Sequence, residues 1–195
     1  MNILITFALK DELFPSSNHQ MKEMIGGHHL TYIETGIGKA RAAAMTMKAA
    51  LEHKPDLILN IGTAGSIHRT KGEILLCNHF IDRDLVKISI DCIRHEIIFP
   101  RERYGTFFVD GQPFYAANTG DSFVTEVSDL QGDAINMESF AEADVADFLG
   151  IPFASMMYIT DIIGQNTADI WKGELPSASV AINNALEKLL SHQQI

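Results

Sequence analysis

Three carboxylates follow short apolar runs that are typical of buried strands: Glu12, Glu138 and Asp161. Ligand crevices in α/β proteins lie outside the carboxyl ends of strands, so these three side chains could converge on one site. Acids gathered in this way can donate protons to a bound molecule or accept them from it. Each acid also has a simpler interpretation, as a solvated side chain or as a charge favoured at a helix N-terminus.

Glycines accompany the carboxylates in two stretches. Gly36-Ile37-Gly38-Lys39 precedes a helix-like run, and the strand-like run Leu57–Ile61 leads into Gly62-Thr63-Ala64-Gly65. Glycine lets backbone come close to a ligand, but Gly62 and Gly65 could equally supply only the turn geometry between a strand and a helix. On general physical grounds, these residues support an α/β protein with a crevice at its strand ends.

Short apolar runs bounded by turn residues predict the strands that must position these side chains. The expected strands are Ile3–Leu9, Leu57–Ile61, Ile74–Phe80, Phe114–Asn118, Asp133–Ile135 and Phe153–Thr160, with Gly27–Glu34 and Gly105–Val109 as additional antiparallel strands. The expected helices are Lys39–His53, Glu138–Leu149 and Ser177–His192. This alternation predicts a three-layer α/β/α sandwich with a central mixed sheet, formed by residues 1–195 as a single domain.

Composition excludes several classes of protein. A net charge of −10 argues against nucleic-acid binding, which needs clustered basic residues. The N-terminal run Ile3–Leu9 lacks a basic leader and is too short to cross a membrane, so we expect neither a signal peptide nor a membrane anchor. Cys77 and Cys92 are expected to be free thiols in a reducing cytoplasm. The eight histidines show no metal-ligand spacing, so no metal and no cofactor is expected.

An ordered series of motifs spans nearly the whole chain: Ala8-Leu9-Lys10-Asp11-Glu12, Gly36-Ile37-Gly38-Lys39, residues 54–65, Gly120-Asp121-Ser122-Phe123, Asn136-Met137-Glu138 and Thr160-Asp161. In this order they resemble the nucleoside phosphorylase and nucleosidase superfamily, and most of all its bacterial 5'-methylthioadenosine/S-adenosylhomocysteine nucleosidase branch. The match is poorer over residues 13–30 and 82–115. The resemblance implies a nucleoside phosphorylase-like fold and a small nucleoside as the substrate.

The resemblance also implies roles for the carboxylates. Asp161, oriented by Thr160, would protonate N7 of a leaving adenine, and Glu12 would deprotonate the attacking water. This division between an acid and a base parallels that of glycosidases. Glu138 would accept hydrogen bonds from the 2'- and 3'-hydroxyls of the ribose. The implied reaction is hydrolysis of the N-glycosidic bond of a purine nucleoside.

The remaining substrate-binding residues implied by the resemblance are Thr63, Phe123, Val124, Met137 and Trp171. Met137 would pack beneath the ribose, Phe123 would stack on the base, and Val124 would offer backbone groups to the purine edge. Trp171 would take the place of an aromatic lid residue. Outside this motif context, a Met or Phe is more often part of a core, and a Trp can be an ordinary surface anchor.

Water is favoured over phosphate as the attacking group. The related phosphorylases carry arginines in the loop after the first strand and before the second glycine stretch, and this chain has none there. A carboxylate at Glu12 would also repel phosphate. However, Met157 stands where the nucleosidase branch has an arginine near the water. A futalosine-type nucleosidase, a phosphate-dependent purine nucleoside phosphorylase and a non-catalytic nucleoside-binding protein therefore remain alternatives.

The resemblance implies a homodimer, because a neighbouring subunit usually completes the pocket in this superfamily. The segment Asp82–Phe99, which mixes apolar and charged residues, is a candidate contact surface. Its alternative interpretation is an internal pair of strands.

Overall fold

The computed structural model describes residues 1–14, 22–88, 90–127, 130–165 and 168–192. The strands are β1 (Asn2–Phe7), β2 (Met24–Ile25), β3 (His28–Glu34), β4 (Leu57–Ser66), β5 (Ile74–Asp82), β6 (Glu96–Ile98), β7 (Tyr115–Thr119), β8 (Ala134–Asn136) and β9 (Phe153–Ile162). The helices are α1 (Lys10–Leu13), α2 (Lys39–His53), α3 (Ser139–Leu149) and α4 (Ala168–Leu190), with a short 3-10 helix at Arg101–Tyr104.

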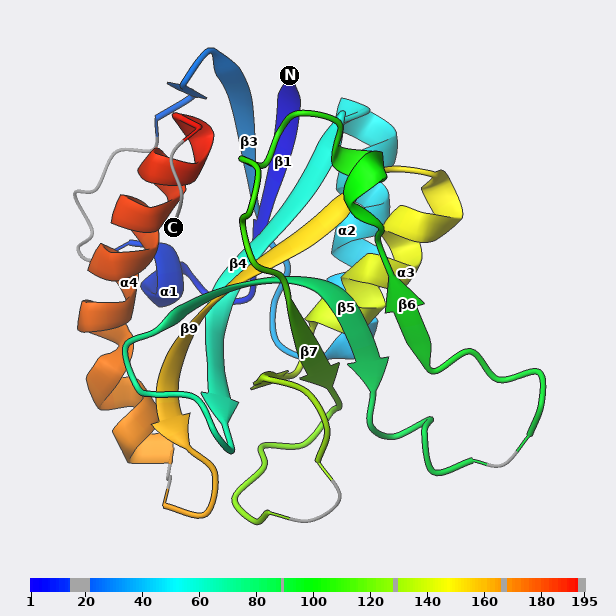
Figure 1. The fold of residues 1–195 in the computed structure, drawn as a ribbon, viewed down its shortest axis with the longest axis vertical. Coiled ribbons are helices and arrows are strands. Elements are labelled where there is room, and N and C mark those ends of the chain that lie inside the picture. Colours follow the sequence, from blue (N-terminus) through cyan, green and yellow to red (C-terminus); the bar gives the residue numbers. More distant parts are fainter. Residues whose placement is uncertain (15–21, 89, 128–129, 166–167, 193–195) are drawn as a thin grey trace.

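One mixed sheet lies between two layers of helices (Figure 1), which confirms the predicted sandwich. Helices α2 and α3 pack together on one face, and α1 and α4 lie on the other. Strand β1 is parallel to β3 and to β4, whereas β5 pairs antiparallel with β6 and β9. Strands β4, β9, β5, β7 and β8 are paired successively, and β8 pairs back to β4, so this half of the sheet closes on itself.

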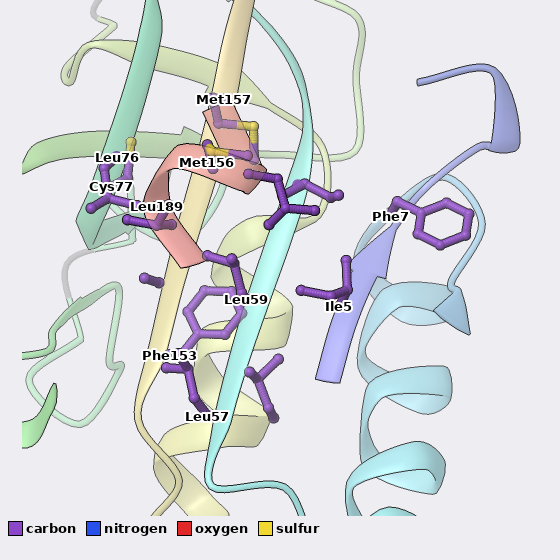
Figure 2. Close-up of a cluster of buried hydrophobic side chains, with 14 of the residues drawn as sticks. Ile5, Phe7, Leu57, Leu59, Leu76, Cys77, Phe153, Met156, Met157 and Leu189 are labelled. Atoms are coloured by element: carbon purple, nitrogen blue, oxygen red, sulfur yellow. The ribbon is translucent and has the colours of Figure 1, made fainter. Parts of the chain in front are cut away.

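Strands β4 and β9 form the centre of the core because both are apolar along almost their whole length. Figure 2 shows Leu57 and Leu59 of β4 beside Phe153 and Met156 of β9, with Leu189 of α4 packed close to them. Burying each large apolar side chain contributes about 1.5–3 kcal/mol. Burial of β4 and β9 therefore holds in place the candidate site residues that lie near the carboxyl ends of these two strands, Thr63 and Asp161.

Three predicted elements differ from the structure: Gly27–Glu34, Gly105–Val109 and the last helix. Gly27–Glu34 forms β3, which pairs antiparallel with the short β2 but parallel with β1, so the prediction of an antiparallel strand is only partly right. Gly105–Val109 is a turn region and not a strand. Its aromatic residues Phe107 and Phe108 are buried in a cluster of rings, which explains the apolar signal. The last helix begins at Ala168 and continues through Pro176, although proline normally ends a helix. Burial of the flanking apolar residues offsets the lost backbone hydrogen bond.

The prediction of a glycine turn after Ile61 is also wrong. Strand β4 continues to Ser66, and its register with β9 shifts between Ala64 and Gly65. The two glycines therefore lie within a strand, where they leave space for side chains from neighbouring elements.

Part of the segment Asp82–Phe99 forms an internal strand pair, in which β6 pairs with β5 from His79 to Ile81. The other described residues of this segment form turns and loops. Cys77 is buried and Cys92 is exposed, and both are free thiols, as predicted. Within the described ranges, no helix has the length and apolar character needed to span a bilayer.

Candidate active site

A cavity of about 350 Å³ brings all the predicted site residues together: Glu12, Thr63, Phe123, Val124, Met137, Glu138, Asp161 and Trp171. They come from α1, β4, β9 and the first turn of α4, from the loop after β7, and from the junction between β8 and α3. The volume is that of a site for a small organic ligand. The expectation that the three carboxylates converge at strand ends is therefore confirmed as geometry.

Glu12 is buried in α1, immediately after β1. Its Oε1 accepts hydrogen bonds from the Thr63 amide at 3.0 Å and the Thr63 hydroxyl at 2.6 Å, and its Oε2 accepts one from the Leu9 amide at 3.1 Å. Burial raises the pKa of Glu12, and the bonds from Thr63 and Leu9 oppose that rise. All three partners are donors, so the site holds a carboxylate that can accept a proton.

Asp161 lies near the end of β9, opposite Gly65 of β4. Its Oδ1 accepts a hydrogen bond from the Thr160 hydroxyl at 2.5 Å, whereas its buried Oδ2 has no partner among the described residues. An unpaired buried polar atom costs about 1–3 kcal/mol, so a ligand is its natural partner. A Cβ at position 65 would lie 2.6 Å from Cδ1 of Ile163 and 3.0 Å from Oδ2 of Asp161, so a larger residue there would crowd both side chains.

Glu138 precedes α3 and faces the N-terminus of α2. Its Oε1 accepts a hydrogen bond from the Gly38 amide at 2.9 Å, and its Oε2 accepts one from the Met137 amide at 3.2 Å. Gly38 has a φ of 91°, a backbone conformation that favours glycine. Burial raises the pKa of Glu138 to about 7, with a smaller contribution from the charge of Glu12, while the Gly38 bond opposes the rise.

Arg83 also lines the cavity, although it was not among the predicted site residues. Its guanidinium is buried and donates to four backbone carbonyls, those of Asn118 at 3.2 Å, Asn136 at 2.9 Å, Gly120 at 2.9 Å and Ser122 at 2.6 Å. Arg83 therefore fixes the loop that carries Phe123 and Val124 against the end of β8.

Arg83 was missed because it lies in residues 82–115, where the motif match is poor. The signal that could have found it is an arginine directly after the buried strand β5, which runs in the same direction as β7 and β8, the strand that precedes Met137 and Glu138. Met157, by contrast, is 2% exposed and points into the core, where Figure 2 shows it beside Met156. Met157 is not among the residues that line the cavity, so its side chain is not part of the candidate site.

The apolar lining residues differ in exposure. Phe123 is 45% exposed at the cavity, so it is not a core residue, and Met137 is half-buried. Trp171, in the first turns of α4, donates its indole N–H to the Thr63 hydroxyl at 2.9 Å. Trp171 is therefore hydrogen-bonded into the site and is not only a surface anchor. Across the described ranges, no group of three or more His, Cys, Asp or Glu side chains is arranged to hold a metal ion.

The family model described as "Phosphorylase superfamily" matches residues 10–116 and 100–191. A 5'-methylthioadenosine/S-adenosylhomocysteine nucleosidase of Bacillus cytotoxicus is 25% identical over 203 aligned positions, covering 87% of this chain and 84% of the relative. The solved nucleosidase of that name from Colwellia psychrerythraea, in complex with adenine, superposes with a TM-score of 0.79 at 18% identity, covering 100% of this chain and 97% of that one. A futalosine hydrolase mutant of Helicobacter pylori gives 0.80 at 16% identity, with coverage of 97% and 98%.

Proposed function

The chain belongs to the phosphorylase superfamily, as its motifs predicted, and from this we propose that it hydrolyses the N-glycosidic bond of a purine nucleoside. The proposed substrate is a 5'-substituted adenosine such as methylthioadenosine or S-adenosylhomocysteine, by analogy with the relatives named above. One observation carries the proposal: Glu12 and Asp161, from different strand ends, line a single nucleoside-sized cavity. No cofactor takes part in the proposed reaction.

Asp161 is the proposed general acid. Cleavage passes through an oxocarbenium-like ribosyl cation, and adenine is a poor leaving group as an anion, so a proton must reach N7. Oδ2 of Asp161 has no partner among the described residues and is the proposed donor of that proton, while the Thr160 hydroxyl holds Oδ1 at 2.5 Å. General acids of this kind contribute about 10²–10⁴-fold to the rate.

Glu12 is the proposed base for the attacking water. The donors from Thr63 and Leu9 fix its carboxylate in one orientation. Because the base must accept a proton, the reaction needs Glu12 ionised when the nucleoside binds. Glu138 is the proposed acceptor for the ribose 2'- and 3'-hydroxyls, and bonds to its carboxylate are stronger than bonds to a neutral group.

The apolar lining completes the proposed binding mode. Phe123 stacks on the purine, the backbone of Val124 meets the purine edge, and Met137 packs beneath the ribose. Trp171 closes the site from α4, and Thr63 positions both Trp171 and the base. These residues line the same cavity as the carboxylates, which supports the assignment.

Hydrolysis is proposed over phosphorolysis on the basis of the charges in the cavity. Arg83 is the one cation among the described lining residues, and its four terminal N–H groups are directed at the four backbone carbonyls named above. A phosphate dianion would thus meet the carboxylate of Glu12 without a free guanidinium to neutralise it. Met157 supplies no charge at the position of the nucleosidase arginine.

A homodimer in the cytoplasm, with residues 1–195 folded as one domain, is the proposed state of the protein. Two apolar side chains at the cavity, Ile37 and Phe123, are 49% and 45% exposed. A second subunit covering them would shield the cavity from bulk solvent. Ile88 and Ile90, in the segment 82–99, are also exposed and are further candidates for this contact.

The test is adenine release from methylthioadenosine in phosphate-free buffer, with analysis of the sugar product. We expect adenine and free methylthioribose without added phosphate. Dependence on phosphate with formation of a ribose 1-phosphate would identify a phosphorylase instead. A parallel panel of S-adenosylhomocysteine, inosine and futalosine would define the 5'-substituent and the base, and binding without turnover of any of them would indicate a non-catalytic nucleoside-binding protein.

A further inference from the structure

Three residues form a directed chain of hydrogen bonds from α4 to Glu12. The indole Nε1–H of Trp171 donates to the Thr63 hydroxyl at 2.9 Å, and that hydroxyl donates to Oε1 of Glu12 at 2.6 Å. An indole N–H can only donate, so the Thr63 oxygen must accept from Trp171. The single hydrogen of the hydroxyl is then left to point at the carboxylate.

We propose that Trp171 is a positioning residue for Glu12, which fixes the Thr63 hydroxyl as a donor and so couples the first turns of α4 to the base. This inference rests on the proposed function for the role of Glu12 as the base. It assigns to Trp171 an action beyond that of an aromatic lid, because the indole N–H, and not only the ring, is required.

The surroundings of Glu12 make this donor important. Glu12 is buried, and it accepts hydrogen bonds from neutral groups, namely the Thr63 hydroxyl and the backbone amides of Thr63, Leu9 and Ala8. Bonds from neutral donors to a carboxylate stabilise its charged form. Without the indole, the Thr63 hydroxyl can rotate towards the cavity, and the ionised form of Glu12 loses part of its stabilisation.

Several charged side chains lie near the hydrogen bonds that join Trp171, Thr63 and Glu12. Glu138 and Glu142, at and within α3, interact unfavourably with a negative charge on Glu12. Asp161 of β9 lines the same cavity, and Asp169 and Lys172 flank Trp171 along α4. The negative neighbours oppose the ionisation of Glu12, and the hydrogen bond from Thr63 favours it. Loss of that donor should therefore raise the pKa of Glu12.

The first test compares Trp171→Phe, which keeps an aromatic ring without the N–H, with Thr63→Val, which removes the hydroxyl at nearly constant shape. In Trp171→Phe, the acidic limb of the pH profile of kcat/KM should move upward by about half a unit to one unit, which is about a 3- to 10-fold loss on that limb. Thr63→Val should shift the limb further. The double variant should match Thr63→Val, because the indole acts only through the hydroxyl. Additive effects, or an equal loss at every pH, would overturn the proposal.

The second test needs no turnover. Trp171 is the only tryptophan in the chain, so the intrinsic fluorescence of the ligand-free protein reports on this residue alone. A pH titration should show a step in fluorescence as Glu12 takes up its proton. The step should disappear in Glu12→Gln and remain in Asp161→Asn, whose carboxylate lines the cavity without joining the chain.

The fluorescence titration also separates the two proposals. A step that disappears in Glu12→Gln in a protein without nucleosidase activity would uphold the coupling and refute the proposed function. A step that persists unchanged in Glu12→Gln, with the variant shown to be folded by thermal melting, would refute the coupling even in an active enzyme.

Discussion

Replacement of Glu142 by glutamine should stabilise the folded protein, and by an amount that grows as the pH rises. Glu142 lies in α3 and is 0% exposed. The Thr6 hydroxyl and the Asn60 side-chain amide are hydrogen-bonded to its carboxyl group. Burial raises the pKa of Glu142 from 4.5 to about 8, and the charge of Glu138 adds to this rise. Glutamine keeps the shape of the side chain and cannot ionise.

The sign follows from linkage between protonation and folding. Below pH 4.5, both the folded and the unfolded chain hold the proton, so the carboxyl group costs nothing through ionisation. Between 4.5 and about 8, the unfolded chain releases the proton while the folded chain retains it, so rising pH favours unfolding. At about 1.4 kcal/mol per pKa unit, the rise from 4.5 to about 8 gives a full cost at pH 9 on the order of 5 kcal/mol.

The assay is urea denaturation of wild type and Glu142→Gln at a series of pH values from about 5 to 9, with the free energy of unfolding extrapolated to water. The difference between the two proteins should be small at the acidic end and reach a few kcal/mol at the alkaline end. Asp144→Asn is the matched control, because Asp144 is exposed on the same helix and its replacement should leave the slope unchanged. Parallel curves for wild type and Glu142→Gln would refute the reasoning.

Three further outcomes follow from the geometry of the cavity. Gly65→Ala should lower kcat by at least about 10-fold, because its Cβ would lie 2.6 Å from Cδ1 of Ile163 and 3.0 Å from Oδ2 of Asp161 and would displace the carboxyl group. Gly62→Ala, whose Cβ would lie 3.4 Å from Oε1 of Glu12 at its nearest contact, should be milder, and equal losses in the steady-state kinetics would contradict this. KM for the nucleoside should rise as the pH falls below about 7, the pKa of Glu138, because the protonated carboxyl is a weaker acceptor for the ribose hydroxyls. A KM that stays constant over roughly a unit and a half on either side of that pKa would count against the assignment of Glu138. Arg83→Met should raise KM by about 10-fold or more with a smaller change in kcat, because four backbone carbonyls lose their donor and the loop that carries Phe123 and Val124 is no longer held in place. Unchanged nucleoside binding in calorimetry would refute this role.

Local rules predicted the elements whose ends are marked by strong signals. Helix α2 begins after Gly38, which has a positive φ, and ends at His53 before Lys54, which adopts a left-handed conformation. The fully apolar runs of β4 and β9 identified the central strands. Glu12, Glu138 and Asp161 were located because each follows such a run, and the ordered motifs then related them to one another.

The features that were missed depend on tertiary contacts. The aromatic run at Phe107 and Phe108 is satisfied by packing of rings rather than by strand pairing. Pro176 stays inside α4 because the helix is held by its buried face against the sheet. The hydrogen bonds of Arg83 join segments more than thirty residues apart, and the bond from Trp171 to Thr63 crosses 108 residues of sequence. No local pattern in the chain encodes such contacts.

The division of labour between Asp161 and Glu12 is tested most directly by changing the leaving group. Rates of wild type, Asp161→Asn and Glu12→Gln would be measured on methylthioadenosine and on a 4-nitrophenyl riboside with the same 5'-methylthio group, whose leaving group departs without a proton. Asp161→Asn should lose at least about 100-fold on the adenosine substrate and less than about 10-fold on the nitrophenyl riboside, whereas Glu12→Gln should lose heavily on both. Equal losses of Asp161→Asn on the two substrates would contradict its role as the acid that protonates the purine.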